Sequence, residues 1–359
     1  MKQYTSLYLA ALLALAPLLL WHCNAQDNAT APAVARTLRP QTLPPIKAKL
    51  LITDGKAEET RLNREVTLLG RTPNAVLAQG TSAGSPPAAL IEKSQILRCT
   101  FAPVFDRAEM VKALNANDWA AAVRILLPAL RPILPYLDLP NNDAFDLVMD
   151  LGSYMTTSAN AELRAATDDT ARERAMSQYD LAYDIYRNAW RADWTPQAQI
   201  AILKGCLVKL AQNKNRDAAN SLARIVAPST DEPTYGHYWL VRGELLRRGG
   251  KTREAIEAVV KSIVFANKDV ETFPASLLLS ADCYTELGEL HRARDVYYEI
   301  ATLFPDTDWA EDALKGLRQV MANDTTRNAE ESALEDVFFN VTEDTNELAD
   351  ELLKQKMDK

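Results

Sequence analysis

The chain has few of the residues from which enzymes build metal centres and nucleophilic sites. Its 359 residues include three histidines and four cysteines, and His237 and His291 lie far apart, with no cysteine or histidine beside either. It has no HExxH, CxxC or Walker motif, no glycine-rich phosphate loop and no GxSxG elbow. We therefore predict that the protein is not an enzyme and that it holds no cofactor or metal.

Paired carboxylates do not change this prediction. Asp168-Asp169 and Glu330-Glu331 lie in polar segments, whereas acid–base catalysis by two carboxyl groups requires burial that separates their pKa values. The enzyme alternative needs a catalytic group in the N-terminal region, and a metal or cofactor in the purified protein would support it.

Positive charge is also scarce. Asp and Glu number 48 against 40 Lys and Arg, the formal net charge is -8, and no basic stripe is present. Nucleic-acid-binding proteins usually carry such a stripe, so we exclude nucleic acid as a partner. After the N-terminal segment no run is long and apolar enough to cross a membrane, and we expect at most a peripheral association with one.

The N-terminus is typical of a targeting signal. A positive start precedes an apolar run from about Leu7 to Trp21, and we predict a secretory signal peptide at residues 1–25. One alternative is a retained anchor, although the run is shorter than the ~20 residues that a spanning helix needs. The other is lipidation of Cys23, although the residues before it are bulkier than those of a lipobox.

Three cysteines follow this segment: Cys99, Cys206 and Cys283. An odd number with long gaps is not a disulfide framework. Cys206 and Cys283 fall in helical patterns, where a cysteine usually serves as a small buried hydrophobic residue. One bridge is the alternative, and the sequence does not choose its pair.

Two segments precede the helical part. Residues 26–46 are rich in Ala, Thr and Pro and predict a semi-extended linker. Residues 47–104 hold short apolar runs separated by Gly and Pro, which predict a small β domain of four or five strands, either a sheet or an SH3-like barrel. Over residues 26–104, ten Lys and Arg face six Asp and Glu. This basic part is either an ordinary solvated face or a docking surface for an anionic envelope polymer.

From Phe105 the pattern is helical, and we predict a repeat domain of helical hairpins over 105–321. A small residue followed by larger ones at helical spacing recurs on one helix face. The pattern begins at five alanines: Ala122, Ala182, Ala218, Ala255 and Ala293. The wide first gap predicts an insertion at about Thr156–Arg174. Three prolines are expected to break the helix that follows Trp119: Pro128, Pro132 and Pro135.

One helix-turn-helix pattern occurs twice between Trp239 and Pro305, and the second copy starts 38 residues after the first. Members of the two copies share the same relative offsets: Trp239, Gly243, Leu246, Gly250, Ala255 and Val259 match Leu277, Ala281, Tyr284, Gly288, Ala293 and Tyr297. Such a unit cannot bury its apolar side alone and must stack on neighbours.

The end of the chain differs in charge. Asp308–Leu317 predicts an amphipathic helix that covers the open end of the stack. Residues 322–359 carry eleven Asp and Glu against four Lys and Arg. This acidic tail is either a solvating segment with a loosely docked helix or a segment that folds on a partner.

The repeated units resemble the tetratricopeptide repeat (TPR) over about 195–320. The segment from Leu303 to Ala313 also looks like the junction between repeats in bacterial envelope proteins such as the Tol-system coordinator and the outer-membrane assembly lipoprotein. Arg242 and Ser280 depart from the family, which usually has Leu at these places. The resemblance implies a mainly α fold, a right-handed α-solenoid whose concave face, lined by first helices, holds a peptide or partner protein.

If this geometry holds, residues one step from the buried side of the first helices line the groove. We predict a partner-binding strip of seven residues: His237, Glu244, Arg247, Arg248, Asp282, Thr285 and Glu286. The alternative for each of them is ordinary solvated helix surface.

The leading hypothesis is a non-enzymatic protein–protein interaction scaffold of the bacterial cell envelope, in the periplasm or associated with the outer membrane. The alternative is a peptidoglycan- or glycan-binding envelope protein that uses the basic β domain. A eukaryotic secretory origin would instead make Asn28, Asn323 and Asn340 glycosylation sequons.

Overall fold

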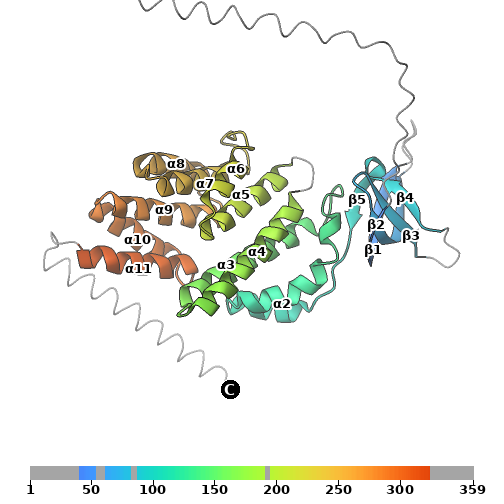
Figure 1. Ribbon diagram of the computed structural model, residues 1–359, viewed down its shortest axis with the longest axis horizontal. Helices are drawn as coiled ribbons and strands as arrows, with labels where there is room; N and C mark the ends of the chain where they lie inside the picture. Colours follow the sequence, from blue (N-terminus) through green and yellow to red (C-terminus); the bar gives the residue numbers. More distant parts are fainter. Residues whose placement is uncertain (1–39, 54–60, 82–86, 191–194, 324–359) are drawn as a thin grey trace, which may run out of the picture. The chain divides into compact units, whose positions relative to one another are not determined.

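The structure is a computed structural model that describes residues 40–53, 61–81, 87–190 and 195–323. The predicted signal peptide, 1–25, lies outside these residues, as does the acidic tail beyond residue 323. Within the described part, an antiparallel sheet precedes a series of α-helices (Figure 1). The prediction of a mainly α protein with a small β part before the helices is confirmed.

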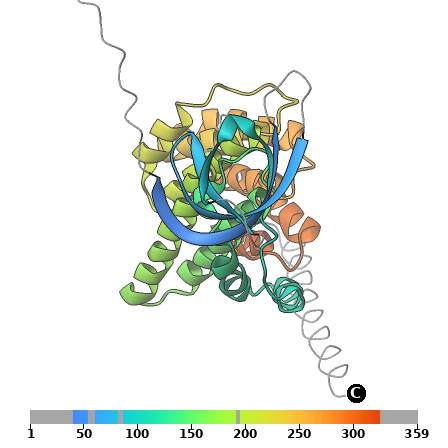
Figure 2. The ribbon, with the colours of Figure 1, turned by 90° about the vertical axis from the view of Figure 1, so that its right-hand side faces the viewer.

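The sheet has five strands: β1 (Gln41–Thr53), β2 (Arg61–Arg71), β3 (Ala75–Gly80), β4 (Ala89–Glu92) and β5 (Ile96–Thr100). Their order is β4-β3-β2-β1-β5, with every neighbouring pair antiparallel. The sheet is strongly curled, and the long strand β1 bends around it (Figure 2). Leu50 and Leu68, on the same side of the paired strands β1 and β2, are fully buried, as expected for strands with one apolar face.

Strand β1 begins earlier than the sequence predicts. Gln41–Ile46 belong to the strand, although we predicted a linker up to residue 46. Pro44 and Pro45, which suggested the linker, lie where the pairing of β1 with β2 is interrupted between Thr42 and Ile46. Proline lacks the N–H that a strand ladder needs, and the irregularity accommodates it.

Eleven helices are described after the sheet. Their bounds are α1 (Arg107–Asn115), α2 (Trp119–Leu130), α3 (Phe145–Ala165), α4 (Asp169–Ala189), α5 (Pro196–Ala211), α6 (Asn215–Leu222), α7 (Tyr235–Arg248), α8 (Thr252–Phe265), α9 (Thr272–Glu286), α10 (Leu290–Leu303) and α11 (Asp308–Asn323). Consecutive helices pack as hairpins from α1/α2 to α9/α10, and the first helices α5, α7 and α9 also contact one another in turn. This is a TPR-like stack of helical hairpins.

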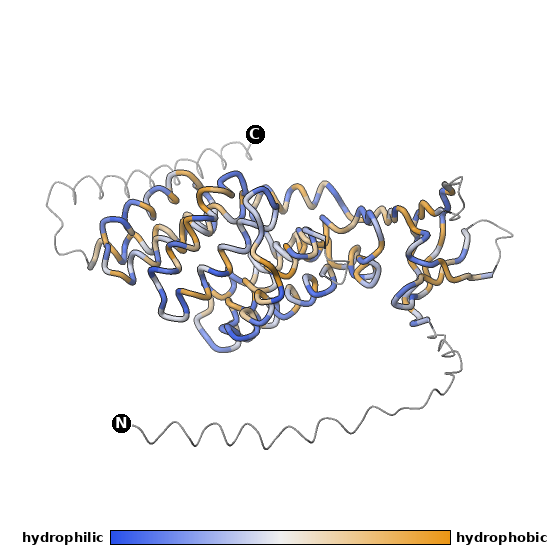
Figure 3. Tube along the Cα trace, turned by 90° about the horizontal axis from the view of Figure 1, so that it is seen from above, coloured by the Kyte–Doolittle hydropathy of each residue, from blue (hydrophilic) through white to orange (hydrophobic). Residues whose placement is uncertain are grey.

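The predicted repeat positions form the core of the stack. All five alanines of the pattern have no exposed surface: Ala122, Ala182, Ala218, Ala255 and Ala293. The adjoining hairpins that carry Trp239 (α7) and Tyr284 (α9) are in contact. Hydrophobic and hydrophilic residues alternate along the helices (Figure 3), as amphipathic packing requires.

Glycine allows close helix approach at two matching places. A Cβ added at Gly152 would lie 2.6 Å from the ring of Tyr186, and one at Gly316 would lie 2.5 Å from the ring of Tyr297. Tyr186 and Tyr297 each lie four residues after an alanine of the repeat pattern, Ala182 and Ala293, and both tyrosines are buried. The small residue on one helix therefore makes room for the tyrosine of another.

The insertion predicted at about Thr156–Arg174 takes the form of two longer helices. These residues lengthen two helices, because α3 and α4 have 21 residues each and leave only a short turn between them. Ala-rich polar sequence is a good helix former, so the extra residues continue the hairpin. The predicted proline break lies later than expected, since α2 contains Pro128 and ends at Leu130.

The lengthened hairpin reaches the last helix of the stack. Arg164, near the end of α3, forms ion pairs with Asp308 at 2.9 Å and Asp312 at 3.2 Å on α11. The side-chain amide of Asn117, between α1 and α2, donates to the carbonyl oxygen of Asp306 at 3.4 Å. Early and late parts of the helical array are thus linked.

The sheet and the helices share one hydrophobic core. Phe101, just after β5, packs against Tyr136 with ring centroids 6.2 Å apart. Asp138 accepts hydrogen bonds from Arg71 of β2 and Lys93. Among the residues that the structure describes, no helix combines the length and apolar character needed to span a bilayer.

Candidate functional site

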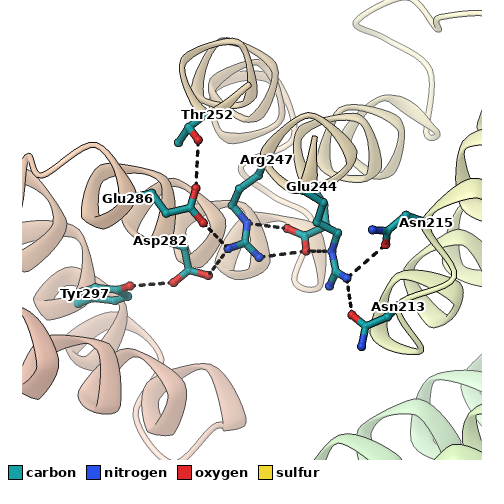
Figure 4. Close-up of polar contacts among 9 residues, drawn as sticks. Asn213, Asn215, Glu244, Arg247, Thr252, Asp282, Glu286 and Tyr297 are labelled. Atoms are coloured by element: carbon teal, nitrogen blue, oxygen red, sulfur yellow. Dashed lines mark hydrogen bonds and ion pairs between the residues drawn. The ribbon is translucent and has the colours of Figure 1, made fainter. Parts of the chain in front are cut away.

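Most of the predicted partner-binding strip forms an internal polar network (Figure 4). Arg247 of α7 binds Glu244 at 3.1 Å on its own helix and Glu286 at 2.9 Å on α9. Asp282 lies 3.9 Å from the same guanidinium and accepts a hydrogen bond from Tyr297 of α10 at 2.7 Å. One arginine therefore joins two neighbouring hairpins.

Arg248 extends the network to the preceding hairpin. It binds Glu244 at 2.6 Å and donates to the side chains of Asn213 at 3.0 Å and Asn215 at 3.3 Å. Burial alone would raise the pKa of Glu244, but the two arginines outweigh burial and hold that pKa below its usual value. The network thus braces three consecutive hairpins.

Six of the seven predicted strip residues therefore have partners within the chain. The sixth is Thr285, whose hydroxyl donates to the carbonyl oxygen of Ala281 at 3.0 Å. Contact of these side chains with a partner stays a prediction. Their hydrogen bonds and ion pairs within the chain also stabilise the surface formed by the first helices.

His237, the seventh, lies elsewhere and is not surface-exposed. Its side chain is 5% exposed, with Nε2 3.6 Å from Glu271 and Nδ1 3.9 Å from Asp269. Both acidic residues precede α9, where Asp269 accepts hydrogen bonds from the backbone N–H groups of Glu271 and Thr272. The histidine is thus separated from the strip and belongs to a second polar cluster.

A cavity of about 410 Å³ opens beside His237. It is formed by the first helices α3, α5 and α7 and by the segment that leads into α9. Its apolar lining consists of Phe145, Met149, Ile200 and Val270. Its polar lining consists of Asp146, Gln197, Lys204, His237, Lys268, Asp269 and Glu271. Apolar wall residues beside converging polar groups are typical of a binding site.

An ion pair spans the wall of the cavity. Lys204 of α5 contacts Glu271 at 2.6 Å and Ser153 of α3 at 2.9 Å. Burial alone would raise the pKa of Glu271, but hydrogen bonds and charge from His237 and Lys204 lower it to about 2. The cluster therefore fixes a carboxylate between three first helices.

The contact of Ser153 with Lys204 is also the pairing that some hydrolases use to activate a hydroxyl. Here the ammonium of Lys204 also lies 2.6 Å from Glu271. Lys204 is therefore engaged in an ion pair. The described thiols are equally unsuited to attack, since Cys99, Cys206 and Cys283 are free and buried. Burial raises the pKa of Cys206 and of Cys283 to about 12. The prediction that these cysteines are small buried residues is confirmed.

The outer face of the sheet carries a second polar surface. Lys47 and Lys49 of β1 are exposed on the face opposite to the buried Ala48 and Leu50, and Arg98 of β5 is exposed beside them. Within the described residues none of these three cations forms an ion pair. Glu65 of β2 lies opposite Lys49 in the register of the two strands.

Sequence comparison adds little to this picture. No protein-family model matches the chain. No curated protein matches it either.

Several solved structures are similar to part of the chain. A thermophilic TPR protein of Thermus thermophilus has 17% identity, covering 58% of this chain and 95% of its own, at a TM-score of 0.27. A tetratricopeptide repeat protein of Parabacteroides merdae has 16% identity, covering 60% and 96%, at 0.24. MamA has 18% identity, covering 44% and 95%, at 0.28. At these values the similarity carries no argument about function, and the fold class follows from the helical hairpins of the chain itself.

Of the residues that line the cavity, only His237 was predicted from the sequence. One signal was present, because Lys204 is the only charged residue between Pro196 and Val208 of α5. Glu271 gave no signal, since it lies in a connection whose place against α5 and α7 depends on the stacking of hairpins.

Proposed function

We propose that the protein is a non-enzymatic scaffold that holds a segment of a partner protein on the face formed by its first helices. The observation that carries this proposal is the cavity between α3, α5 and α7. Three hairpins contribute to one binding surface there, so the site exists only in the stacked array. Open surfaces of this kind, built by neighbouring repeats, are what solenoid proteins use for binding.

The side-chain chemistry also favours binding over reaction. Apolar residues such as Met149 and Ile200 line the cavity next to fixed charges, a mixture suited to peptide side chains. The polar network around Arg247 supports the same surface from α7 and α9. This network fixes the relative positions of the first helices for a ligand that contacts several of them.

We further propose that the scaffold acts in the bacterial cell envelope, in the periplasm or at the outer membrane. The support is the N-terminal pattern of residues 1–25 and the likeness of the segment around Pro305 to repeat junctions of envelope proteins. Signal cleavage and lipidation at Cys23 can be distinguished by N-terminal mass spectrometry of the protein purified from its own cells.

Site-specific crosslinking in living cells tests the binding face. A photoreactive amino acid at Gln197, on the rim of the cavity, is expected to give one dominant adduct whose partner is identified by mass spectrometry. The matched control is the same substitution at Glu257, which is exposed on the second helix α8. Equal adducts at both positions, or none at Gln197, would contradict the proposal.

A second candidate function uses the sheet. The exposed cations Lys47, Lys49 and Arg98 share the outer face, which suits an anionic envelope polymer. Sedimentation of the full chain with purified sacculi, compared with the triple variant Lys47→Glu, Lys49→Glu, Arg98→Glu, tests this. Equal sedimentation of both proteins would rule the sheet out as the docking site.

A further inference from the structure

Negative charge outweighs positive charge at the cavity. Four carboxylates and two ammonium groups gather there: Asp146, Asp150, Asp269 and Glu271, with Lys204 and Lys268. Burial raises the pKa of Asp150; Lys204 lowers it, and the carboxylates of Glu271 and Asp146 raise it further. These carboxylates therefore repel one another across the cavity, and Asp146 forms no ion pair within the described residues. An additional cation would relieve this repulsion.

The site already accommodates one ammonium group. Lys204 places its Nζ within 2.6 Å of a Glu271 oxygen and 2.9 Å of the Ser153 hydroxyl. This pairing uses one oxygen of Glu271, and it leaves Asp146 and Asp269 without a cationic partner at hydrogen-bonding distance. The chemistry that binds an ammonium is thus present, with acceptors to spare.

A buried and unpartnered nitrogen points to the same ligand. The Nδ1 of His237 has no hydrogen-bond partner although the side chain is 95% buried. Asp269 lies 3.9 Å away, too far for a hydrogen bond. A buried polar atom without a partner is costly. The side chain of Asp269 is 33% exposed. A hydrogen-bond donor that enters from the cavity would satisfy both Nδ1 of His237 and the carboxylate of Asp269 after a small rotation of that carboxylate.

The apolar wall completes the recognition. Met149 and Ile200 lie on α3 and α5, and Val270 is 79% exposed at the mouth. A lysine side chain matches this arrangement, because its methylene stem packs on apolar surface while its compact ammonium reaches polar groups.

We propose that this cavity binds a lysine side chain of the partner segment, with the ammonium between Asp269 and the carboxylates of α3. The proposal rests on the proposed function and specifies the chemistry of the partner.

Selection of peptides by the full chain tests the proposal. A library of random twelve-residue peptides displayed on phage is selected against the intact protein, and selected sequences are synthesised with acetylated N-termini. Binding is measured by fluorescence polarisation for each peptide and for its Lys→norleucine analogue, which keeps the stem and removes the charge. We expect lysine enrichment and a loss of affinity of about tenfold or more in the analogue.

The double variant Asp146→Asn, Asp269→Asn tests whether the preference for lysine arises at the cavity. Asn at 269 retains the side-chain oxygen that accepts hydrogen bonds at the start of α9. The double variant is expected to bind the lysine and norleucine peptides equally weakly. The matched control is Asp184→Asn on α4, whose carboxylate is 52% exposed and whose substitution should leave both affinities unchanged.

The outcomes separate this proposal from the proposed function. Selected peptides that compete at the cavity but show no lysine enrichment would overturn the lysine assignment and leave the scaffold function standing. Binding that depends on a free N-terminal amine instead of lysine would also overturn it. Failure to select any peptide would contradict both.

Discussion

At the scale of single residues, the charge of Glu271 is held in place by two neighbours. Its pKa of about 2 lies well below the usual value for Glu, because Lys204 and His237 outweigh the effect of burial. A carboxylate with a lowered pKa stabilises the folded state above its unfolded pKa, and this contribution is lost as the pH falls toward the folded pKa.

Replacing Glu271 with Gln should therefore cost stability in a pH-dependent way. The side chain is 43% exposed, so solvent screens the pair, and we expect a loss of about 1 kcal/mol at pH 7. The difference from wild type should disappear as the pH falls from about 5 to about 2. Urea unfolding across this range measures it. Glu254→Gln, in the exposed pair with Lys251, is the control, and a difference constant with pH would contradict the account.

Another residue-scale prediction concerns Gly316. Alanine is usually about 1 kcal/mol better than glycine in a helix, but here its Cβ would lie 2.5 Å from the ring of Tyr297. We expect Gly316→Ala to lower the free energy of unfolding by about 1–2 kcal/mol through overpacking. In a Tyr297→Leu background the same substitution should be neutral or favourable. Equal effects in both backgrounds, measured by chemical unfolding, would disprove the steric explanation.

At the scale of elements, the long hairpin α3/α4 distinguishes this stack from a simple series of equal repeats. Its extra length brings Arg164 to α11, where Asp308 and Asp312 are in reach. Burial alone would lower the pKa of Arg164, but the acidic residues of α11 raise it. Three acidic groups of one helix thus face one arginine of another.

Arg164→Met should release the last helix of the stack. The arginine side chain is 23% exposed, so we expect a stability loss of about 1 kcal/mol and faster hydrogen exchange of α11 amides. Exchange in α7 should stay unchanged. Arg172→Met, in a pair whose members are 60% and 95% exposed, is the matched control. Unchanged exchange of α11 would show that the hydrophobic contacts of that helix suffice.

The sequence predicted the repeated elements because their pattern is local. The alanines at 122, 182, 218, 255 and 293 recur on one helix face and are buried, and short apolar runs indicated the strands. The length of α3 and α4 could not be predicted as readily, since polar Ala-rich sequence suits a helix and a loop insertion alike. The start of β1 was missed because its two prolines are typical of a linker.

The candidate site was harder to predict for a physical reason. Its groups come from α3, α5, α7 and the connection before α9, and only the stacking of hairpins brings them together. Helical periodicity predicted Arg247 and Glu244 as members of one strip, but it did not indicate that they pair with each other. His237 was placed on the surface by periodicity, whereas the connection carrying Asp269 covers it.

At the scale of the whole molecule, the sheet and the helices are joined through Asp138. Its side chain is 10% exposed and contacts both Arg71 and Lys93. Burial alone would raise the pKa of Asp138, but hydrogen bonds from these two cations lower it. Removing this charge leaves Arg71 and Lys93 without their shared counter-ion in a partly buried place, which is costly.

Asp138→Asn should therefore loosen the sheet from the helices. We expect a stability loss of about 2–4 kcal/mol and faster hydrogen exchange in β1 and β2 than in α7 and α8. Asp184→Asn, in the half-exposed pair with Arg187, should change neither. A uniform increase in exchange over the whole chain would show that the substitution destabilises the entire fold and does not act on the contact between the sheet and the helices.

The central claim is that a partner segment lies on the first helices. Hydrogen–deuterium exchange of the protein, alone and with the partner identified by crosslinking, tests it most directly. We predict protection in α3, α5, α7 and the connection before α9, with no change in the second helices α8 and α10. Protection confined to the sheet, or to the second helices, would contradict the claim.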